Sequence, residues 1–466
     1  EDRQGREEDH QARQEGIAGA PLGARCQEED TEDILMKVTV VGGGLAGSEA
    51  AWALAERGLD VTLTEMRPVR RTAAHQTERI GELVCSNSFK SVELHNAHGL
   101  LKAELRDLGS ILLPLADEAR VPGGAALAVD REVFGQLVHA KVHSHPRITV
   151  VREEATALPE PGIVCTGPLT SDALAEAIAA RLGTGALAFY DAIAPIVSAE
   201  SLDQDAVYAK SRYDKGGGDD YLNAPLDRDG YEAFVDALTT ADQFTAHEFD
   251  QVPYFEGCLP VEEMARRGRE TLRFGPMKPV GLADPRTGRD PYAVVQLRRE
   301  DKAGQMWNLV GFQTRLRIPE QRRVFTMIPG LGEAEFLRWG SIHRNSYINS
   351  PASLGPALQE RAGAPLFFAG QPTGGEGETE SLGTGLLAGI NLARALDGKP
   401  PAVPPPTTML GGLLRYLREA DPEHFQPMNA NFGLLEPLDG KVKKAERKER
   451  QVARAREDFA TWLATL

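Results

Sequence analysis

The clearest alternation of apolar and polar positions begins near residue 37, where a valine-rich run leads into three successive glycines. The chain stays apolar over a helix-length stretch to Arg57, and a second apolar run at 60–64 ends on Glu65. This pattern predicts a strand at 37–41, a glycine turn, a helix and a second strand at 60–65.

Further along, the apolar spacing switches between helical and strand periods, which is typical of α/β proteins. Helical spacing predicts helices at 97–108 and from Arg131 to about residue 142. Short apolar runs predict strands at 148–151, 162–167 and 365–371, and a glycine-spaced helix follows at 380–394.

The glycine turn has the spacing of a dinucleotide-binding motif. Gly42 permits a tight turn, Gly44 leaves room for a pyrophosphate beside the backbone, and Gly47 lets the helix pack closely on the strand. The helix N-terminus presents unpaired N–H groups to the phosphates, and Glu65 stands where a carboxylate accepts from a ribose hydroxyl. The pattern predicts a dinucleotide site, against the alternative of a glycine-rich turn that binds nothing.

Residues 205–325 differ from the segments on either side in composition and in the spacing of apolar residues. They contain a loop rich in glycine and aspartate at 216–220 and alternating, strand-like segments near 292–297 and 307–312. We interpret them as an inserted α/β domain, after which the chain returns to the first domain. The predicted division is an extension at 1–35, a dinucleotide-binding domain at 36–204 and 326–435, the insertion at 205–325, and a basic helix at 436–466.

The formal net charge of −16 argues against a globally basic nucleic-acid binder. Eleven acids and four arginines give residues 1–35 a charge of −7, so the remainder carries −9. Any RNA contact therefore needs a local basic patch. The basic stripe at 440–466 is one candidate, although a solvated helix face is the commoner explanation of such a stripe.

Residues 1–35 are polar and lack the apolar core of a signal peptide, and Met36 immediately precedes the first strand. We expect this segment to be disordered, either as a start-site artefact or as a regulatory tail. No apolar run reaches about 18 residues, so no membrane span is predicted. The four cysteines are scattered without zinc spacing, which suggests a reducing, cytoplasmic setting.

Two of the cysteines stand in sequences that suit a reactive thiol. Cys85 follows an apolar entry and precedes small polar residues, as expected for a thiol on a loop near a cofactor. Cys258 lies in a Gly-Cys-Leu-Pro turn with Arg266 and Arg267 downstream, and a positive field favours thiolate. A free or buried structural cysteine is the alternative for both, and it is the preferred interpretation of Cys165, which lies inside an apolar strand.

Two further segments carry candidate binding residues. Arg273 and Lys278 lie in a loop of glycines and prolines and suit a phosphate or a glutamyl tail, with surface charge as the alternative. The second segment offers rings for stacking on a flat heterocycle and an amide to read it, or else forms a hydrogen-bonded loop. Its residues are His343, Arg344, Asn345 and Tyr347.

Together these motifs resemble one family, the folate- and FAD-dependent tRNA (uracil-5-)-methyltransferases called TrmFO. The shared segments run in order over about residues 36–435, whereas residues 1–35 match nothing in that family. They are 41–51 (VGGGLAGSEAA), 65–68 (EMRP), 82–88 (ELVCSNS), 255–260 (FEGCLP), 273–282 (RFGPMKPVGL), 343–345 (HRN), 380–381 (ES) and 385–391 (GLLAGIN). Such a set is far more specific than the glycine motif alone.

The resemblance implies an α/β fold with a Rossmann-like FAD-binding domain and an inserted smaller α/β domain. It implies a cytoplasmic enzyme that methylates a T-loop uridine of tRNA to ribothymidine, without a membrane or a stable protein partner. Methylenetetrahydrofolate would donate the carbon, FAD would be the cofactor, and NAD(P)H would supply reducing equivalents. The family's two essential cysteines fall at Cys85 and Cys258. We expect Cys258 to add to uracil C6 and Cys85 to be the base or partner thiol, with the reverse order left open.

The resemblance also assigns candidate binding residues. We expect the pterin to stack on the flavin with His343 at its other face, and Arg344, Asn345 and Tyr347 are further folate candidates. Arg266, Arg267, Arg273 and Lys278 are candidates for RNA or for the folate tail. The expected cofactor-binding residues are Gly42, Gly43, Gly44, Leu45, Ala46, Gly47, Glu65, Met66, Arg67, Gly370, Gln371 and Glu380.

The chain departs from the family pattern at two places. Gly43 stands where the family usually has alanine, which is harmless. Residues 376–378 read Glu-Gly-Glu where the family's third residue is aromatic, which adds charge near the expected flavin and puts the loop contacts there in doubt.

Three other functions compete with this one. The related GidA/MnmG flavoproteins, which modify wobble uridine, share the flavin domain and the folate carbon but have a helical C-terminal domain that we do not expect here. An FAD-dependent NAD(P)H oxidoreductase would not need Cys85 and Cys258. A non-catalytic, FAD-bearing RNA-binding protein would bind tRNA without turnover.

Overall fold

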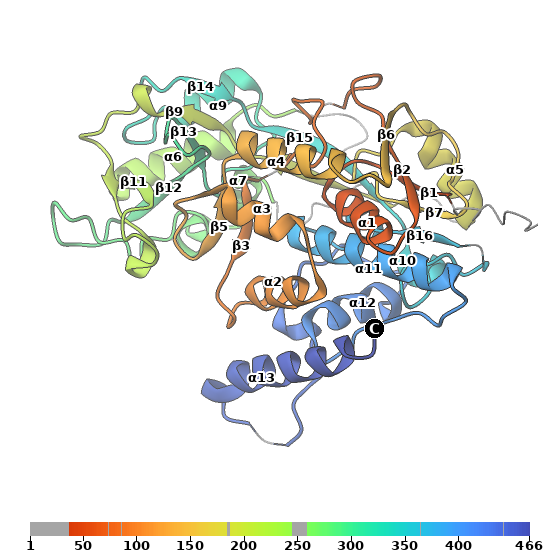
Figure 1. Ribbon diagram of the computed structural model, residues 1–466. Coiled ribbons are helices and arrows are strands. Elements are labelled where there is room, and N and C mark those ends of the chain that lie inside the picture. Colours follow the sequence, from red (N-terminus) through yellow and green to blue (C-terminus); the bar gives the residue numbers. More distant parts are fainter. Residues whose placement is uncertain are drawn as a thin grey trace, which may run out of the picture. The chain divides into compact units, whose positions relative to one another are not determined.

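A parallel sheet organises the first domain, and the strand–turn–helix–strand unit predicted from the sequence lies at its middle (Figure 1). The computed structural model describes residues 37–466 except 73, 85, 184–186, 245–258, 364 and 441, so the predicted extension at 1–35 lies outside the described residues. The unit consists of β1 (Lys37–Val41), α1 (Leu45–Ala55) and β2 (Asp60–Glu65), at the predicted bounds.

The sheet has five strands in the order β16-β7-β1-β2-β6. β6 (Ile148–Arg152), β7 (Gly162–Val164) and β16 (Leu366–Phe368) join β1 and β2, and every pairing is parallel. The strand predicted at 162–167 is β7, which pairs with β1 from Thr39 to Val41. All five carboxyl ends therefore meet at one edge.

Helices pack against this sheet, and two of them, α1 and α11, lie in close contact with each other. The predicted helix at 97–108 is α2 (Ala97–Leu108), and the one near 380–394 is α11 (Glu378–Leu396). α11 packs directly on α1: a Cβ at Gly385 would stand 2.2 Å from the Ala46 carbonyl oxygen, and a Cβ at Gly389 would stand 2.7 Å from that of Ala50. The two helices approach this closely because glycine occupies both positions.

Shorter elements complete the first domain. A three-stranded antiparallel sheet has the order β3-β5-β4. The helix predicted to start at Arg131 does begin at that residue, because the Asp130 side chain caps it by accepting a hydrogen bond from the Val133 N–H (3.0 Å). The bounds are β3 (Ser88–Ser91), α3 (Leu112–Glu118), β4 (Arg120–Val121), β5 (Ala126–Val129), α4 (Arg131–His143) and α5 (Asp172–Leu182).

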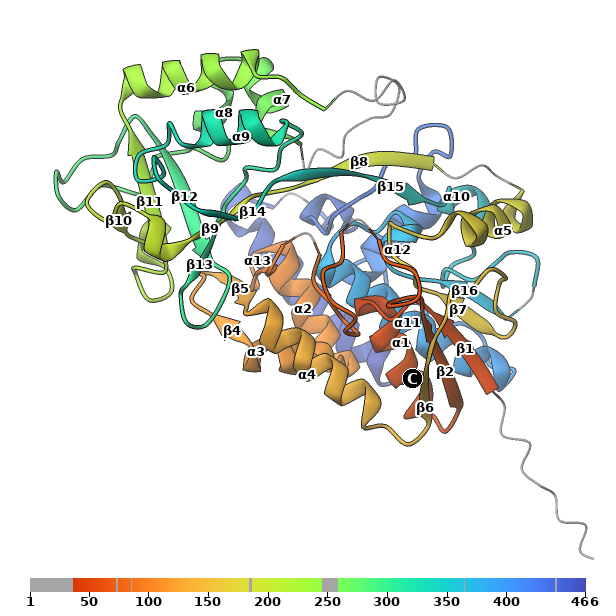
Figure 2. The same ribbon diagram turned by 90° about the horizontal axis from the view of Figure 1, so that it is seen from above.

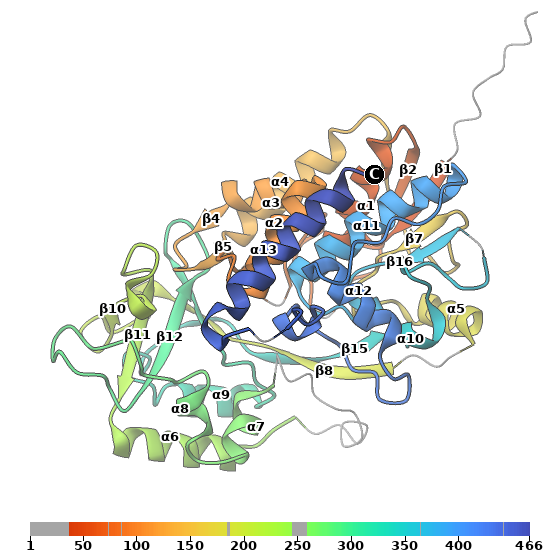
Figure 3. The same cartoon turned by 90° about the horizontal axis from the view of Figure 1, so that it is seen from below.

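The basic C-terminal segment forms α13 (Lys444–Leu463), whose apolar face packs against the first domain (Figure 3). Phe459 and Trp462 are buried, and Arg456 pairs with Asp107 of α2 (2.5 Å). α12 (Met409–Glu419) lies between α11 and this helix along the chain. The side chains of Lys444, Arg447 and Lys448 stay exposed at the helix start.

A second sheet forms the inserted part. Its six strands have the order β10-β11-β12-β13-β9-β14 and are antiparallel, and Tyr231, Phe234, Phe312 and Phe325 lie in its core. The sheet spans 196–338, whereas the domain bounds of 205–325 remain a prediction. The bounds are β9 (Ile196–Ser198), β10 (Tyr208–Ala209), β11 (Tyr221–Leu226), α6 (Arg228–Thr240), α7 (Val261–Arg266), α8 (Thr271–Phe274), β12 (Ala293–Arg299), β13 (Met306–Leu309), α9 (Ile318–Phe325) and β14 (Phe336–Arg338).

The chain enters and leaves this second sheet through a two-stranded antiparallel ribbon (Figure 2). The ribbon is formed by β8 (Leu187–Ile193) and β15 (Ser341–Tyr347), paired over their whole lengths. α10 (Ser350–Ser353) follows and leads back to β16.

The close approach of α1 and α11 generates a first prediction. Gly385→Val would drive a branched side chain into the α1 backbone, so we expect it to lower the free energy of unfolding by about 1–3 kcal/mol or more. Urea unfolding measures the loss. Gly332→Ala is the control, since a Cβ there meets no atom within 4 Å. Equal unfolding midpoints for the two variants would contradict the close contact.

A buried carboxylate generates a second prediction. Glu104 of α2 is fully buried and accepts from the N–H groups of Met409 and Leu410 (both 2.8 Å) at the start of α12. Burial outweighs these hydrogen bonds and raises the pKa of Glu104 to about 8. The folded state therefore holds a proton that the unfolded state has released, and stability falls as the pH rises from about 5 to 8.

Glu104→Gln should flatten this loss, because the amide does not titrate. The measurement is the thermal midpoint across that pH range in the parent and the variant. Glu449→Gln, on the exposed surface of α13, is the control and should keep the parent's slope. Parallel curves for all three proteins would mean that Glu104 does not contribute.

Candidate functional site

A cavity of about 350 Å³ lies at the carboxyl ends of the parallel strands. Its volume is in the range of small-molecule sites, and its position is where open α/β sheets bind ligands. Each of the five strands contributes the residues that directly follow it. These are Gly42–Ala46 after β1, Met66 and Arg67 after β2, Glu153–Ala155 after β6, Cys165–Leu169 after β7, and Gly370 and Gln371 after β16.

The glycine turn leaves this cavity open on the side of the backbone. Gly42 has a φ of +106°, and a Cβ there would stand 2.5 Å from the Cys165 carbonyl oxygen. A Cβ at Gly47 would stand 1.8 Å from the Gly42 carbonyl oxygen, whereas a Cβ at Gly44 would meet no atom within 4 Å. Gly42 and Gly47 therefore allow the turn to form, and Gly44 leaves space at the start of α1.

Glu65 fastens this turn to the end of β2. Its Oε2 accepts from the Gly43 N–H (3.0 Å), and its Oε1 accepts from the backbone N–H (2.9 Å) and Nε (2.8 Å) of Arg67. Burial by itself would raise the pKa of Glu65, but the hydrogen bonds and charge of Arg67 hold it below its ordinary value. The carboxylate is thus charged, buried and in contact with the turn.

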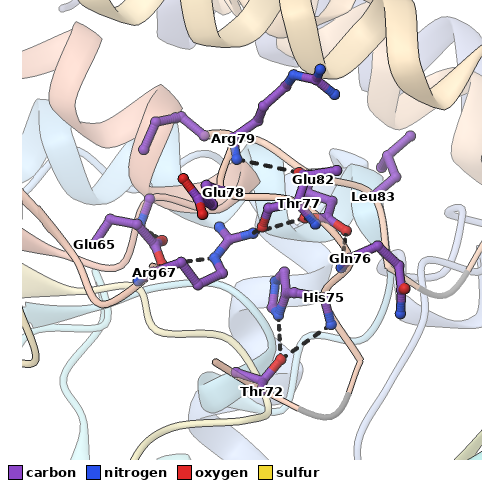
Figure 4. A network of polar contacts seen from close by, with 12 residues as sticks. Glu65, Arg67, Thr72, His75, Gln76, Thr77, Glu78, Arg79, Glu82 and Leu83 are labelled. Atoms are coloured by element: carbon purple, nitrogen blue, oxygen red, sulfur yellow. Dashed lines mark hydrogen bonds and ion pairs between the residues drawn. The ribbon is translucent and has the colours of Figure 1, made fainter. Parts of the chain in front are cut away.

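Arg67 also contacts the following segment, residues 76–82, through Glu82, as Figure 4 shows. Its Nη1 donates to Glu82 Oε2 (2.9 Å), and the same oxygen accepts from the Thr77 N–H (3.0 Å) and hydroxyl (2.7 Å). The Glu82 Oε1 accepts from the Gln76 N–H (2.7 Å). The network orders the chain from residue 76 to residue 83, which leads into Cys85.

The start of α11 forms another wall of the cavity. Gln371 donates to Glu376 (2.9 Å), and Glu376, Gly377 and Glu378 all line the cavity, so the added charge of this segment does stand at the site. Desolvation raises the pKa of Glu378 while nearby Lys90 opposes the shift. Glu380 does not line the cavity; it is buried, accepts from the Ala430 N–H (2.7 Å) and pairs with His98 (3.2 Å).

The inserted part and the ribbon contribute the remaining wall. Arg298 of β12 and Gln313 line the cavity from the inserted part, and Ile193 and Asn345 line it from the ribbon. Arg298 was not among the sequence candidates, because a lone arginine on an alternating strand resembles any solvent-facing residue. Gln313 carried no sequence signal either, since it lies in a loop beyond β13.

Two of the three cysteines discussed above lie outside the described residues, namely Cys85 and Cys258. The neighbours of both are described. Val84 and Ser86 line the cavity, and the N–H of Val261, three residues after Cys258, donates to the carbonyl of the cavity residue Gln313 (2.8 Å). Cys165 is buried, as predicted, and burial raises the pKa of its thiol above the ordinary value.

The folate candidates divide between the cavity and the core. Asn345 lines the cavity, whereas the Tyr347 side chain is buried against Phe425 and its hydroxyl donates to the Phe425 carbonyl (3.2 Å). His343 and Arg344 lie within β15, paired with Asp191 and Tyr190, and their side chains are outside the described part.

The four basic candidates lie away from the cavity lining. Arg266 donates to Gln243 (3.1 Å) and Glu263 (2.5 Å), and Arg273 stacks on the Tyr292 ring at 3.7 Å. Arg267 is exposed and Lys278 is half-buried. Their distribution over α7 and the 273–278 segment fits a surface contact better than a place inside the cavity.

Two kinds of feature are not found in the parts of the chain that the structure describes. There, no group of three or more His, Cys, Asp or Glu side chains is arranged to hold a metal ion. None of the helices described is long and apolar enough to cross a membrane.

Known proteins resemble the chain over most of its length. The family model described as Glucose inhibited division protein A matches residues 37–400. A Geobacter sulfurreducens protein named methylenetetrahydrofolate--tRNA-(uracil-5-)-methyltransferase TrmFO is 58% identical over 92% of this chain and 99% of its own length. A protein of the same name from Thermus thermophilus is 53% identical over 92% and 97%.

The fold has solved counterparts. The structure of Aquifex aeolicus GidA in its form II crystal superposes with a TM-score of 0.65 at 16% identity, covering 92% of this chain and 73% of that one. The form I crystal gives a TM-score of 0.64 at 16% identity, covering 92% and 76%. At this identity the match establishes the fold alone.

The glycine turn generates the prediction of this subsection. Gly44→Ala places a methyl group in open cavity space, so we expect less than about 1 kcal/mol of destabilisation but a clear loss of bound dinucleotide. Gly42→Ala is the matched variant, and it should destabilise the fold itself because of its positive φ and its contact with Cys165. Unfolding midpoints and absorption of the purified proteins separate the two effects. Full cofactor occupancy in Gly44→Ala would contradict a ligand at this turn.

Proposed function

The chain belongs to the GidA family and, within it, to the TrmFO methyltransferases, and we propose that it methylates a T-loop uridine of tRNA at C5. Methylenetetrahydrofolate would donate the carbon, FAD would be the cofactor, and NAD(P)H would supply electrons. The observation that carries the proposal is the identity of 52–58% to relatives of that name over about nine-tenths of this chain. The cytoplasm, where these substrates are found, is the expected location.

The residues at the cavity fit FAD. Gly44 leaves open space at the N-terminus of α1, where the first N–H groups have no partner within the helix and the helix dipole favours phosphate. Glu65 is charged and buried at the end of β2, and its Oε2 has a lone pair left to accept from a ribose hydroxyl. Bound there, FAD would supply the reducing equivalents for the methyl group.

The chain's own part in the reaction is nucleophile and proton transfer. Uracil C5 is a weak nucleophile, and a thiolate that adds to C6 turns it into an enolate able to attack a one-carbon electrophile. A base then removes the C5 proton, and the thiol leaves. We assign the nucleophile to Cys258 and the base or partner thiol to Cys85. Two contacts support this: Val84 and Ser86 line the cavity, and the segment after Cys258 is hydrogen-bonded to Gln313 there.

The other substrates are assigned by chemistry. We place the pterin near Asn345, which lines the cavity, with His343 and Arg344 as further candidates from β15; Tyr347 is buried against Phe425, so its part would be to support this strand. We assign the tRNA backbone or the folate tail to Arg266 and Arg267, which are exposed, and to Arg273 and Lys278, which are half-buried. Glu380 is buried in the first turn of α11 and does not line the cavity. We propose that it holds this turn in place through its contacts with His98 and the Ala430 N–H.

The alternatives have less support. The GidA-type wobble-uridine enzyme shares the family model and the fold, but the two crystal structures are only 16% identical to this chain. An FAD-dependent NAD(P)H oxidoreductase would leave the cysteine segments at the cavity without a role.

Transfer of a labelled carbon tests the proposal. Purified protein is incubated with unmodified tRNA transcript, NADPH and methylene-labelled tetrahydrofolate, and the digested RNA is analysed for labelled ribothymidine. We expect label in the parent and a loss of about 10³-fold or more in Cys258→Ser with flavin retained, because the enolate no longer forms. Cys26→Ser, in the segment 1–35 that shares no motif with the family, is the matched control and should keep full activity.

Two results would overturn these assignments. Labelled ribothymidine from Cys258→Ser at nearly the parent rate would remove Cys258 as the nucleophile. Label in another nucleoside, or none from a flavin-loaded protein that binds tRNA, would move the function to the wobble-uridine enzyme or to a flavin reductase.

A further inference from the structure

Arg298 is a buried cation in the wall that the inserted part contributes to the cavity. It belongs to β12, lines the cavity and is only 9% exposed. Its Nε donates to Asn87 Oδ1 (3.0 Å) and its Nη2 donates to Ser86 Oγ (3.2 Å). Asn87 is fully buried and donates through Nδ2 to the carbonyls of Val129 (3.0 Å) and Arg299 (2.9 Å). The amide is thus fully engaged, and it holds the guanidinium in one orientation at the cavity wall.

Among the described residues, the partners of Arg298 give its charge no counter-ion. Asn87 and Ser86 are neutral. On the neighbouring strand β11, the Tyr221 phenol also faces the guanidinium, and its hydroxyl donates to the Gly123 carbonyl (2.9 Å). Burial raises the pKa of Tyr221 although Arg298 opposes the shift, so this phenol is neutral as well. Burying a guanidinium without a counter-ion is costly, which indicates that a ligand in the cavity supplies the negative charge.

Two other Lys or Arg side chains line the cavity in the described part of the chain, Arg67 and Lys90. Arg67 is paired with Glu65 (2.8 Å) and Glu82 (2.9 Å), so its charge is already balanced. Lys90 is exposed to solvent, which screens its charge. Arg298 is therefore the cation of this described lining that is both held in place and without an acidic partner.

Arg298 and Ser86 both keep a hydrogen-bond donor for a ligand. Of the N–H groups of the guanidinium, Asn87 and Ser86 engage one each, and at least one remains after the Tyr221 phenol is satisfied. The Ser86 oxygen accepts from Arg298 and from the Ser88 N–H (3.2 Å), so both of its lone pairs are used and its hydrogen is left to donate. Ser86 also lines the cavity. The two side chains form a donor pair suited to an oxygen that carries negative charge.

The proposed reaction creates a negative charge on an oxygen. When a thiolate adds to uracil C6, the S–C6 bond forms and the π electrons of C5=C6 move, so that C4 and C5 share the double bond and O4 carries the charge. When C5 then attacks the one-carbon unit, the C4=O bond forms again and O4 is neutral. The charge exists only between these two steps, and a cation held in place stabilises it without having to reorganise. Arg298 keeps its proton throughout, so no proton has to enter or leave at this point.

We propose that Arg298 and the Ser86 hydroxyl bind O4 of the target uracil and stabilise the enolate that forms there. This assignment rests on the proposed function, but not on which of the two cysteines attacks C6. It gives the inserted part a catalytic residue, because Arg298 comes from β12 while Ser86 belongs to the first domain. The reacting ring then lies at the wall where the two parts of the chain meet.

The test changes both the protein and the substrate oxygen. Flavin-loaded protein methylates tRNAs in a single turnover, and the target position of these tRNAs carries uridine, 4-thiouridine or 2-thiouridine. The proteins are the parent, Arg298→Met, Arg298→Lys and Arg299→Met. Arg299 is the matched control, because it is the next residue on β12, it does not line the cavity, and its guanidinium lies over the Trp307 ring at 5.4 Å. Flavin absorption, tRNA affinity and the unfolding midpoint are measured for each protein.

The charge of Arg298 should affect the rate and not the binding. Arg298→Met should slow methyl transfer to uridine by about 10²–10³-fold at unchanged tRNA affinity, because the bound uracil is neutral until the enolate forms. Sulfur at position 4 accepts hydrogen bonds poorly, so the same variant should lose about 10-fold less on 4-thiouridine than on uridine. Its loss on 2-thiouridine should equal its loss on uridine. Arg298→Lys should fall between the parent and Arg298→Met, and Arg299→Met should match the parent on all three tRNAs.

Methylation of uridine by Arg298→Met at the parent rate would overturn the role of Arg298. Equal losses on uridine and 4-thiouridine would mean that Arg298 does not contact O4, and a smaller loss on 2-thiouridine alone would place it at O2; either result overturns the assignment. If Arg298→Met does not fold, Arg298→Lys and Ser86→Ala decide in the same way, since both disturb the donors at O4. No methylated product from the parent would overturn the proposed function and the enolate role with it, whereas an active parent without this coupling would overturn the role of Arg298 alone.

Discussion

The buried carboxylate of Glu65 is the contact on which the cavity depends. One oxygen holds the Gly43 N–H, so the glycine turn is fixed against the end of β2, and the other holds the backbone and the side chain of Arg67. Arg67 then reaches Glu82 and orders the segment that leads to Cys85. A carboxylate 5% exposed is stable in its charged form only because these donors surround it, so the arrangement is connected and each member needs the others.

Other buried carboxylates follow a different rule, because they meet N–H groups rather than cations. Glu49 of α1 accepts from the Ile111 and Leu112 N–H groups at the start of α3, and Glu104 does the same at the start of α12. Burial raises the pKa of Glu49 to about 7, in contrast to Glu65. Both glutamates join helices by satisfying N–H groups that a helix start leaves unpaired. Among Glu65, Glu49 and Glu104, the pKa is lowered only for Glu65, which has an arginine side chain hydrogen-bonded to its carboxylate.

The inserted part is more than an appended binding surface. Arg298 and Gln313 line the cavity, and Arg298, Arg338 and Glu300 contact residues of the first domain directly or through Arg131. A site shared in this way needs both sheets in place before it is complete. After the insertion the chain returns to the first sheet, where the residues that follow β16 and those at the start of α11 form another wall of the same cavity.

The sequence by itself determined the β1–α1–β2 unit, the helix at 97–108 and the buried state of Cys165, because each depends on local periodicity and on glycine spacing over a few residues. The sequence motifs also identified segments that line the cavity, including parts of residues 82–88. It did not reveal Arg298 and Gln313, nor the burial of Glu380 and Tyr347. Arg298 meets Asn87 across 211 positions of the chain, and α11 meets α1 across more than 300. Local pattern encodes the period of an element, but only the order of strands in the sheet and the close packing of helices decide which distant side chains meet.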